Sequence, residues 1–552
     1  MNRIHQLLWD RVRLWLPFAL GVALLGTVVG RMDAVPTGDA PHLLAIADKL
    51  NSLLNRGEYL EFLESWSSLV TPHPPAGFAV PVLMRWLDLG LSVPLATSVV
   101  GLGLAWHGMV LLSRVGGRVV HGPWMGAVML FAMPATWTFS AHMVWDVLAA
   151  GCVTACIGHL HASDGLRNMG HAALFGVFMG LSFVTKYTAP AFLVLPAAFA
   201  GVAVLRFGSW TGLLVAIGAF AVVGGPWLFT HGDSVVAYVL SSSGATQTIS
   251  ASPASSWSAR FAPENLLYYP TVLRDMVGWP GVGLMLLALA FAWRKPGGRW
   301  AALGVVGGAV VLTFAGENQS RYVYPALPLL GAIIDVGLRP GLHSALARLG
   351  MVCGLAATMP SLVGGWMTVN AEATHPPTRD QTHAAESLLA WGAWPSAAMP
   401  FRPVSNPVEA WDVDAALSAL AAESGETDYG HQVGILLPND ARLPPGSTYA
   451  WRAGSLGMDW NFATVVPRGP AGKPMVFVGP LKPVGIRMSR RFDVGYAIHP
   501  RGSMPELMTQ LSAQLKWQHD LPHSLQGSVF RVPAAGWRTP FGVQLQKDPI
   551  DG

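Results

Sequence analysis

Long apolar runs recur along the first two thirds of this chain, and they constrain its fold more than any other feature. Several approach the roughly 20 residues that a helix needs to cross the hydrocarbon core of a bilayer. Backbone polar groups in lipid must be satisfied within their own segment, so we expect these runs to be helices. The pattern predicts about eleven spans, at Leu14–Gly30, Pro94–Leu112, Val119–Phe139, Met143–Leu160, Ala172–Val184, Thr188–Leu205, Gly212–Phe229, Val277–Trp293, Ala301–Phe314, Tyr322–Leu338 and Gly350–Trp366.

The composition agrees with a membrane protein and excludes an ordinary soluble domain. Of the 552 residues, 52% are hydrophobic and only 12% are charged, far from the average for soluble proteins. The net charge of +4 follows from the distribution of basic residues between the spans, so no nucleic-acid partner is predicted. The three cysteines, Cys152, Cys156 and Cys353, fall inside predicted spans, where small buried residues are favoured over redox or metal-binding ones.

Basic residues in the short connections decide the orientation, because they favour the cytoplasmic side. The pattern predicts a cytoplasmic N-terminus, with a first outer loop at 31–93, a second at 231–276, and everything after Trp366 outside. The turns at Lys186 and at Glu317–Arg321 also fall outside. A multi-pass protein of the bacterial inner membrane is expected. The basic residues that carry this orientation are Arg3, Arg11, Arg13, Arg114, Arg118, Arg167, Arg206, Arg294, Lys295, Arg299, Arg339 and Arg348.

The two outer loops contain amphipathic segments. Apolar residues between Leu43 and Leu54 recur with helical spacing, which predicts a helix on the membrane surface. The segment Phe78–Leu89 is too short and too charged to span, so we expect an interfacial helix. The polar stretch Ser241–Ser258 favours either a lid or a plain connector, and the aromatic Leu266–Leu273 segment predicts another surface helix.

The tail differs in kind from the membrane part. Its apolar runs shorten to Val433–Leu437, Met475–Val478 and Val529–Val532, and Glu506–Leu515 has helical spacing. The predicted fold is therefore an all-α polytopic membrane domain over residues 1–368, followed by a C-terminal extracytoplasmic α/β domain over residues 369–552. The tail contains no nucleotide-binding glycine pattern, metal-spaced Cys/His set or nucleophile elbow, so a docking or stabilising role is its default.

Three charged residues stand at the predicted outer ends of spans, against the general distribution of charge. They are Asp39, Lys186 and Arg321. An ionisable group at such a position is costly unless it is paired or functional, so these residues are the first candidates for a site. Asp146, in the first outer turn of its span, is a fourth for the same reason.

The order and sidedness of several motifs resemble the GT-C glycosyltransferases that use polyprenyl-phosphate sugars. Within this family the bacterial branch related to protein mannosyltransferases and aminoarabinose transferases is most similar, over roughly residues 10–370. The motifs are Asp39 at the start of a large outer loop, a His-Pro-Pro at His73–Pro75, Gly180–Thr188 between two spans, Pro226-Trp227 ending another, and Ser320–Pro328 opening a late one.

This resemblance implies transfer of a sugar from a polyprenyl-phosphate donor to a hydroxyl of a lipid, glycan or protein on the outer face. Asp39 would be the general base of a single inverting displacement. Lys186 and Arg321 would bind the phosphate, because arginine can grip its oxygens bidentately and lysine acts as a point charge. Further substrate-binding residues are expected to be Asp146, His73, His42, Tyr187, Tyr322 and Glu317.

Each assignment has an alternative. Asp39 can cap the helix that follows it, and Lys186 and Arg321 can extend to the headgroups. His73 can be a structural turn residue or can bind a divalent metal with Asp146, and no other cofactor is indicated. Ala40 stands where many protein mannosyltransferases carry a second acidic residue, and Pro72-His73 where aminoarabinose transferases have an acidic-basic pair. The rival functions are a lipid or sugar transporter or flippase, and a non-catalytic scaffold.

Overall fold

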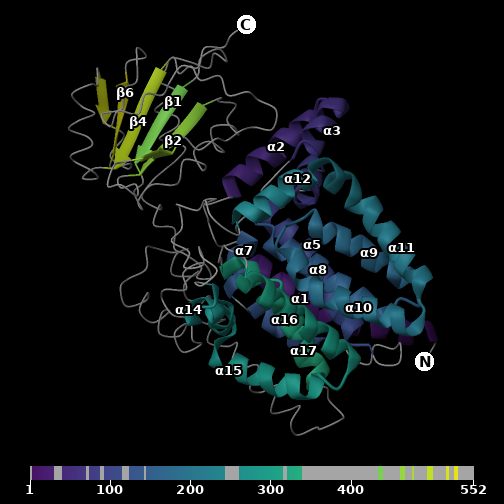
Figure 1. The fold of residues 1–552 in the computed structure, drawn as a ribbon. Helices are drawn as coiled ribbons and strands as arrows, with labels where there is room; N and C mark the ends of the chain where they lie inside the picture. The colour runs from purple at the N-terminus through teal and green to yellow at the C-terminus, as the bar shows by residue number, and fades with distance from the viewer. Residues whose placement is uncertain are drawn as a thin grey trace. The chain divides into compact units, whose positions relative to one another are not determined.

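The computed structural model describes most of the membrane part and six strands of the tail (Figure 1). The described residues are 3–29, 40–69, 74–87, 92–114, 123–132, 134–141, 144–242, 260–314 and 320–338, then 433–438, 460–466, 475–477, 494–500, 517–520 and 527–532. They belong to two compact units. The membrane unit comprises Met1–Asp33 and Leu69–Ser405, and the second unit comprises Ala34–Ser68 and Asn406–Gly552.

The described part of the membrane unit is entirely helical. Its elements, several of them short 3₁₀ helices marked η, follow the predicted apolar runs closely. In chain order they are α1 (Arg3–Val29), η1 (Pro75–Phe78), α4 (Ala79–Trp86), α5 (Val93–Leu112), α6 (Trp124–Ala132), α7 (Pro134–Ala141), α8 (Asp146–Ala162), α9 (Met169–Phe183), η2 (Ala189–Leu193), α10 (Val194–Phe207), α11 (Trp210–Val223), α12 (Gly225–Ser242), α14 (Pro263–Leu266), α15 (Tyr268–Ala292), α16 (Pro296–Phe314), η4 (Ser320–Val323) and α17 (Ala326–Gly337).

Several of these helices have the length and apolar composition of membrane spans. Among the described residues they are Val93–Leu112, Ala189–Arg206 and Pro296–Phe314, to which the bent pair α11–α12 adds a fourth. The pair bends by 71° at Gly224, just before Pro226, where glycine and proline weaken the helix. The protein is thus an integral membrane protein. The count of about eleven spans stays a prediction, since Gly350–Trp366 lies outside the described residues.

Large apolar side chains are exposed along α10 and α11. Val202 on α10 is 61% exposed, and Leu214 and Val222 on α11 are 67% and 77% exposed. In water such a surface would be unfavourable, but a helix that faces lipid needs no polar covering. These two helices therefore present the lipid-facing surface expected of spans.

Glycines allow the central helices α5 and α8 to pack backbone against backbone (Figure 1). A Cβ on Gly101 of α5 would meet the backbone of Val147 and Leu148, and one on Gly151 of α8 would meet the backbone of Gly101. Gly108 repeats this contact seven residues further along α5, against Thr154. Small residues of this kind drive helix association in membranes, where apolar side chains gain little by leaving lipid.

Two charged side chains near the end of α17 form hydrogen bonds with backbone groups at helix termini. Asp335 of α17 accepts a hydrogen bond from the Gly126 N–H in the first turn of α6, at 2.5 Å. Lys295 donates to the Val336 carbonyl in the last turn of α17, also at 2.5 Å. Free N–H groups at the start of a helix favour an anion, and free carbonyls at its end favour a cation. These charges are therefore explained by helix capping.

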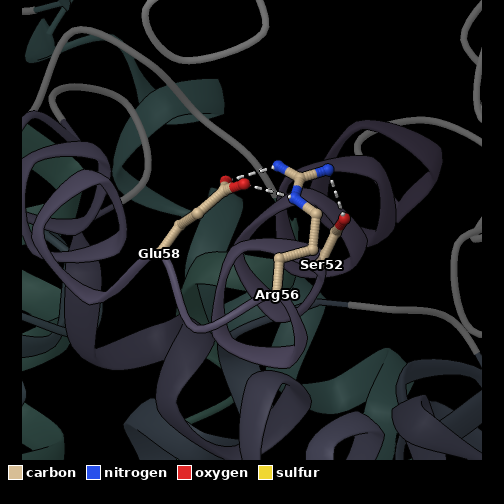
Figure 2. Close-up of polar contacts among 3 residues, drawn as sticks. All are labelled: Ser52, Arg56 and Glu58. Atoms are coloured by element: carbon tan, nitrogen blue, oxygen red, sulfur yellow. Dashed lines mark hydrogen bonds and ion pairs between the residues drawn. The ribbon is translucent and has the colours of Figure 1, made fainter.

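The second unit begins with two helices of the first outer loop, α2 (Ala40–Asn55) and α3 (Tyr59–Ser67). The turn between them is closed by Arg56, whose guanidinium bonds both carboxylate oxygens of Glu58, at 2.9 and 2.7 Å, and Ser52 at 3.2 Å (Figure 2). Gly57 adopts φ 75°, which glycine tolerates best. The predicted amphipathic pattern is confirmed, since the residues Leu43, Leu44, Ile46, Ala47, Leu50 and Leu53 are all buried.

The strands of the tail form one mixed sheet in the order β3-β2-β1-β4-β6-β5. The strand β1 is parallel to β2 and β4, and the other pairs are antiparallel. The three predicted apolar runs fall on β1, β3 and β6, whereas the predicted helix at Glu506–Leu515 lies outside the described residues. The strand bounds are β1 (Val433–Pro438), β2 (Trp460–Val466), β3 (Met475–Phe477), β4 (Val494–Pro500), β5 (Trp517–Asp520) and β6 (Gly527–Val532). The domain boundary at 368 and the α/β class stay predictions.

We expect Gly151→Ala to destabilise the membrane unit, because its Cβ would overlap the Gly101 backbone. Overpacking of this kind costs about 1–3 kcal/mol. The matched control is Gly218→Ala on α11, where a Cβ meets nothing within 4 Å, and where alanine adds up to about 1 kcal/mol of helix propensity. Thermal unfolding in detergent should show a lower Tm for the first variant only, and equal Tm values would contradict the close contact.

Candidate active site

A buried ion pair lies at one end of the central helices. Asp146 is the first residue of α8, and its side chain is only 1% exposed. Lys186 stands in the turn between α9 and η2, and its Nζ lies 2.5 Å from Asp146 Oδ1. A carboxylate buried at this depth requires a cationic partner, because desolvation is otherwise too costly. Lys186 is that partner.

A second cation and an aromatic ring complete the cluster. Lys186 Nζ lies 5.1 Å from the centroid of the Tyr322 ring, and the guanidinium carbon of Arg321 lies 5.9 Å from the same centroid. Both distances are in the range of a cation–π interaction. The fold therefore brings together Asp146, Lys186, Arg321 and Tyr322, which are separated by up to 176 residues in the sequence. These four described residues comprise one carboxylate, two cations and one aromatic ring.

The second oxygen of Asp146, Oδ2, is buried and has no hydrogen-bond partner among the described residues. One oxygen therefore holds Lys186, and the other is enclosed by the protein. Two cations beside a buried carboxylate are groups that can bind an anion such as a phosphate.

The end of the first outer loop is attached beside the ion pair. The Ala76 N–H of η1 donates to the Val184 carbonyl at 2.9 Å, two residues before Lys186. The Phe78 ring packs edge-on against Trp145, the neighbour of Asp146, with centroids 4.9 Å apart. Both partners of the ion pair thus have a neighbour in contact with this segment.

The 3₁₀ helix η4, which carries Arg321 and Tyr322, is anchored by Tyr324. This side chain is fully buried, and its hydroxyl lies 2.9 Å from Thr136 Oγ1 of α7. Its ring packs edge-on against Phe139 at 5.2 Å. Tyr324 belongs to the predicted Ser320–Pro328 motif, but its partner Thr136 was not expected. No charge or spacing marked it, because a threonine within an apolar run is ordinary.

Arg260 is a buried basic residue that the sequence interpretation missed. Its Nη1 donates to the Phe314 carbonyl at the end of α16, at 3.1 Å. Asn265 Nδ2 bonds the carbonyls of Arg260 and Thr313, both at 2.9 Å. These contacts stabilise the end of the helix that precedes Arg321. Its basic side chain in a predicted outer loop could have marked Arg260 as a candidate, just as the charge of Lys186 in a predicted outer turn marked that residue.

The remaining candidates lie elsewhere or outside the described residues. Asp39, His73 and Glu317 are outside the described residues. The backbone of His42 lies in the first turn of α2, in the second unit. Tyr187 contacts Trp227, with ring centroids 5.9 Å apart. Over the described part of the chain, no group of three or more His, Cys, Asp or Glu residues could hold a metal ion.

A separate polar cluster lies about 20 Å along α8 from Asp146, as 13 helical residues imply. The imidazoles of three helices form a chain, with 3.1 Å between Nε2 of His107 and His159 and 2.9 Å between Nδ1 of His159 and His171. His159 also stacks on Phe178. Hydrogen bonds between spans stabilise a bundle by about 1 kcal/mol each. The three histidines therefore help to hold α5, α8 and α9 together.

Two solved structures with a similar fold are of ArnT from Cupriavidus metallidurans. The structure in the apo state covers 93% of this chain and 97% of its own, with 14% identity and a TM-score of 0.57. The structure bound to undecaprenyl phosphate covers 94% and 98%, with 13% identity and a TM-score of 0.58. This chain has the fold of ArnT. No protein-family model and no curated protein sequence matches it.

The ArnT fold confirms the fold that the resemblance of the motifs implied. The match extends over nearly the whole length of both chains. At this low sequence identity, the similarity lies in the fold and not in the amino-acid sequence. The cluster around Lys186 therefore lies within an ArnT-type membrane protein.

We expect Lys186→Ala to destabilise the protein, because it leaves the Asp146 carboxylate buried without its cation. Removal of one partner of a buried pair costs about 3 kcal/mol or more. The double variant Asp146→Asn/Lys186→Met removes both charges and should recover most of this loss. Thermal unfolding of the wild type and these variants measures the effect. Equal Tm values for the single and double variants would show that the pair is not coupled.

Proposed function

We propose that this protein is a membrane glycosyltransferase that uses a polyprenyl-phosphate sugar as donor. The observation that carries the proposal is the convergence of Lys186 and Arg321 on Tyr322, beside buried Asp146. The ArnT fold supports it, since one ArnT structure binds undecaprenyl phosphate. A lipid-linked phosphate needs cations near the membrane surface, and this cluster provides two of them.

The two cations have different tasks in this proposal. Arg321 presents a planar guanidinium that can bond two phosphate oxygens at once, whereas Lys186 acts as a point charge. As the sugar leaves, negative charge grows on the phosphate, and fixed cations stabilise that charge most where water is excluded. Asp146 holds Lys186 in place and in this way helps to orient the substrates.

Asp39 is proposed as the general base, on the strength of its place at the start of the first outer loop. It would take the proton of the acceptor hydroxyl as that oxygen attacks the anomeric carbon. The glycosidic bond to phosphate breaks on the opposite side of the ring, so a single displacement inverts the configuration. The phosphate departs with the electron pair and remains on the polyprenyl lipid.

The other candidates are proposed to line the substrate site. His42 and His73 belong to the first outer loop, and Glu317 precedes Arg321. Tyr187 and Tyr322 flank the two cations in sequence. The acceptor is a lipid, glycan or protein hydroxyl. The site faces the outer side of a bacterial inner membrane, with the N-terminus in the cytoplasm and the tail domain on the same side as the site.

We expect Asp39→Asn to abolish transfer without loss of folding, because the amide cannot take the acceptor proton. Purified protein in lipid nanodiscs would be given a panel of polyprenyl-phosphate sugars and a membrane lipid extract as acceptor source. The measurement is release of free polyprenyl phosphate. Asp164→Asn is the matched control, since Asp164 is 85% exposed and asparagine tolerates its positive φ of 49°.

Donor-specific release that stops in Asp39→Asn and continues in Asp164→Asn is the expected result. Release at the wild-type rate by Asp39→Asn would remove Asp39 as the base and leave the donor assignment intact. If the wild type releases no polyprenyl phosphate but moves the intact donor across the bilayer, the protein is a flippase.

We expect Arg321→Lys to raise the KM for the donor more than it lowers kcat. Lysine keeps the positive charge but cannot bond two phosphate oxygens in one plane, so binding weakens by about tenfold for each 1.4 kcal/mol lost. Steady-state kinetics against donor concentration measures this. Arg167→Lys, at an exposed inner turn, is the control. An unchanged KM in Arg321→Lys would favour the alternative in which Arg321 extends to the lipid headgroups and does not bind the donor phosphate.

A further inference from the structure

Trp227 lies where three parts of the membrane unit meet. It is the third residue of α12, directly after the break with α11, and it is only 7% exposed. Its indole N–H donates to the Leu69 carbonyl at 2.9 Å. Its ring stacks on Tyr187, with centroids 5.9 Å apart, and on His231, at 5.5 Å, each with an interplanar angle of 24°.

The contact with Tyr187 links Trp227 to the ion pair, because Tyr187 directly follows Lys186 in the chain. The turn is short: the Lys186 N–H bonds the Ser182 carbonyl at 3.3 Å, and the Lys186 carbonyl accepts from Ala189 at 3.0 Å. A lysine ammonium lies at the end of a flexible stem, so its position depends on the backbone that carries it. A ring packed on Tyr187 restricts that backbone.

The contact with Leu69 reaches the end of the first outer loop. Leu69 is 3% exposed, and the same stretch of chain then continues to η1, where Ala76 bonds Val184 and Phe78 packs on Trp145. A buried carbonyl needs a donor, and tryptophan combines that donor with a large stacking ring. Phenylalanine could replace the ring, but it could not replace the N–H group.

His231 holds the other side of this arrangement, one turn further along α12. Its Nδ1 lies 2.7 Å from Thr230 Oγ1 and 3.2 Å from the Trp227 carbonyl. The imidazole is therefore constrained by its own helix, and the Trp227 ring is stacked between α12 and the Lys186 turn. The side chain thus connects the start of α12 to two segments that are distant in sequence.

We propose that Trp227 is a positioning residue of the polyprenyl-phosphate site, which holds the Lys186 turn through Tyr187 and joins it to the end of the first outer loop through Leu69. This inference rests on the proposed function, because it takes Lys186 to bind the donor phosphate. Trp227 does not touch the reacting atoms. Its effect is on where the ammonium of Lys186 lies when the phosphate binds.

The test uses Trp227→Leu, which removes ring and donor, and Trp227→Phe, which removes only the donor. Trp210→Leu on α11 is the matched control, since Trp210 is 53% exposed. Binding of undecaprenyl phosphate to the full chain in nanodiscs is measured by the ligand-induced shift in Tm, and amide hydrogen exchange is followed over 66–69 and 184–188. Release of polyprenyl phosphate from the donor provides KM and kcat.

We expect Trp227→Leu to weaken binding by about tenfold, since small misplacements of a binding group cost up to about a hundredfold. It should also raise KM more than it lowers kcat, and speed exchange in both segments. Trp227→Phe should speed exchange at 66–69 and keep most of the affinity for undecaprenyl phosphate. This variant keeps the test decisive if the leucine variant does not fold. Trp210→Leu should match the wild type.

Several results would overturn the proposal. If amide exchange over 184–188 is unchanged in Trp227→Leu, Trp227 does not restrain the Lys186 turn. If exchange becomes faster but the affinity for the donor is unchanged, Trp227 is a structural contact and not a positioning residue. A wild type that binds no undecaprenyl phosphate overturns the proposed function itself, and the role of Trp227 at a phosphate site falls with it. Wild-type binding with unaltered variants overturns only the role of Trp227.

Discussion

A carboxylate buried at the end of a membrane helix determines much of the arrangement around it. Asp146 begins α8 with its side chain almost fully buried, and such a group is stable there only with a cation at hand. Lys186 supplies that cation from the turn that follows α9. The start of α8 and the turn after α9 are thereby held together. Their charged side chains and the Tyr322 ring then form a cluster that contains a second cation, Arg321.

The rest of the membrane unit makes this cluster possible by close packing. Gly101 and Gly151 let α5 and α8 approach until their backbones touch, and lipid offers no comparable gain to larger apolar side chains. At the other end, Asp335 and Lys295 bond helix termini. The charges of the bundle are therefore of two kinds. Some bond backbone groups, whereas Asp146, Lys186 and Arg321 gather around one another and the Tyr322 ring.

Apolar runs predicted the membrane class and the helix positions, because helix formation in lipid is dictated locally. The fold was predicted by the resemblance of the motifs to a known family. The sequence also marked Asp146, Lys186 and Arg321 as candidates, since a charge at the predicted outer end of a span is conspicuous in an apolar sequence. The sequence interpretation missed Arg260, although it carries the same signal. Thr136 had no signal at all, because its role depends on Tyr324, which is 188 residues away.

The sequence by itself determined that this chain enters a membrane and where its costly charges lie, since the price of burying backbone and charge in lipid depends on residue type alone. Only the tertiary structure decided which of those charges meet. Lys186 pairs with Asp146, and Arg321 shares the Tyr322 ring with it, because α8, α9 and η4 pack at one end of the bundle. Trp227 likewise acquires its place only when Leu69 and Tyr187 are brought to it by the fold. Contacts between segments distant in the chain depend on the packing of whole helices, which no local pattern specifies.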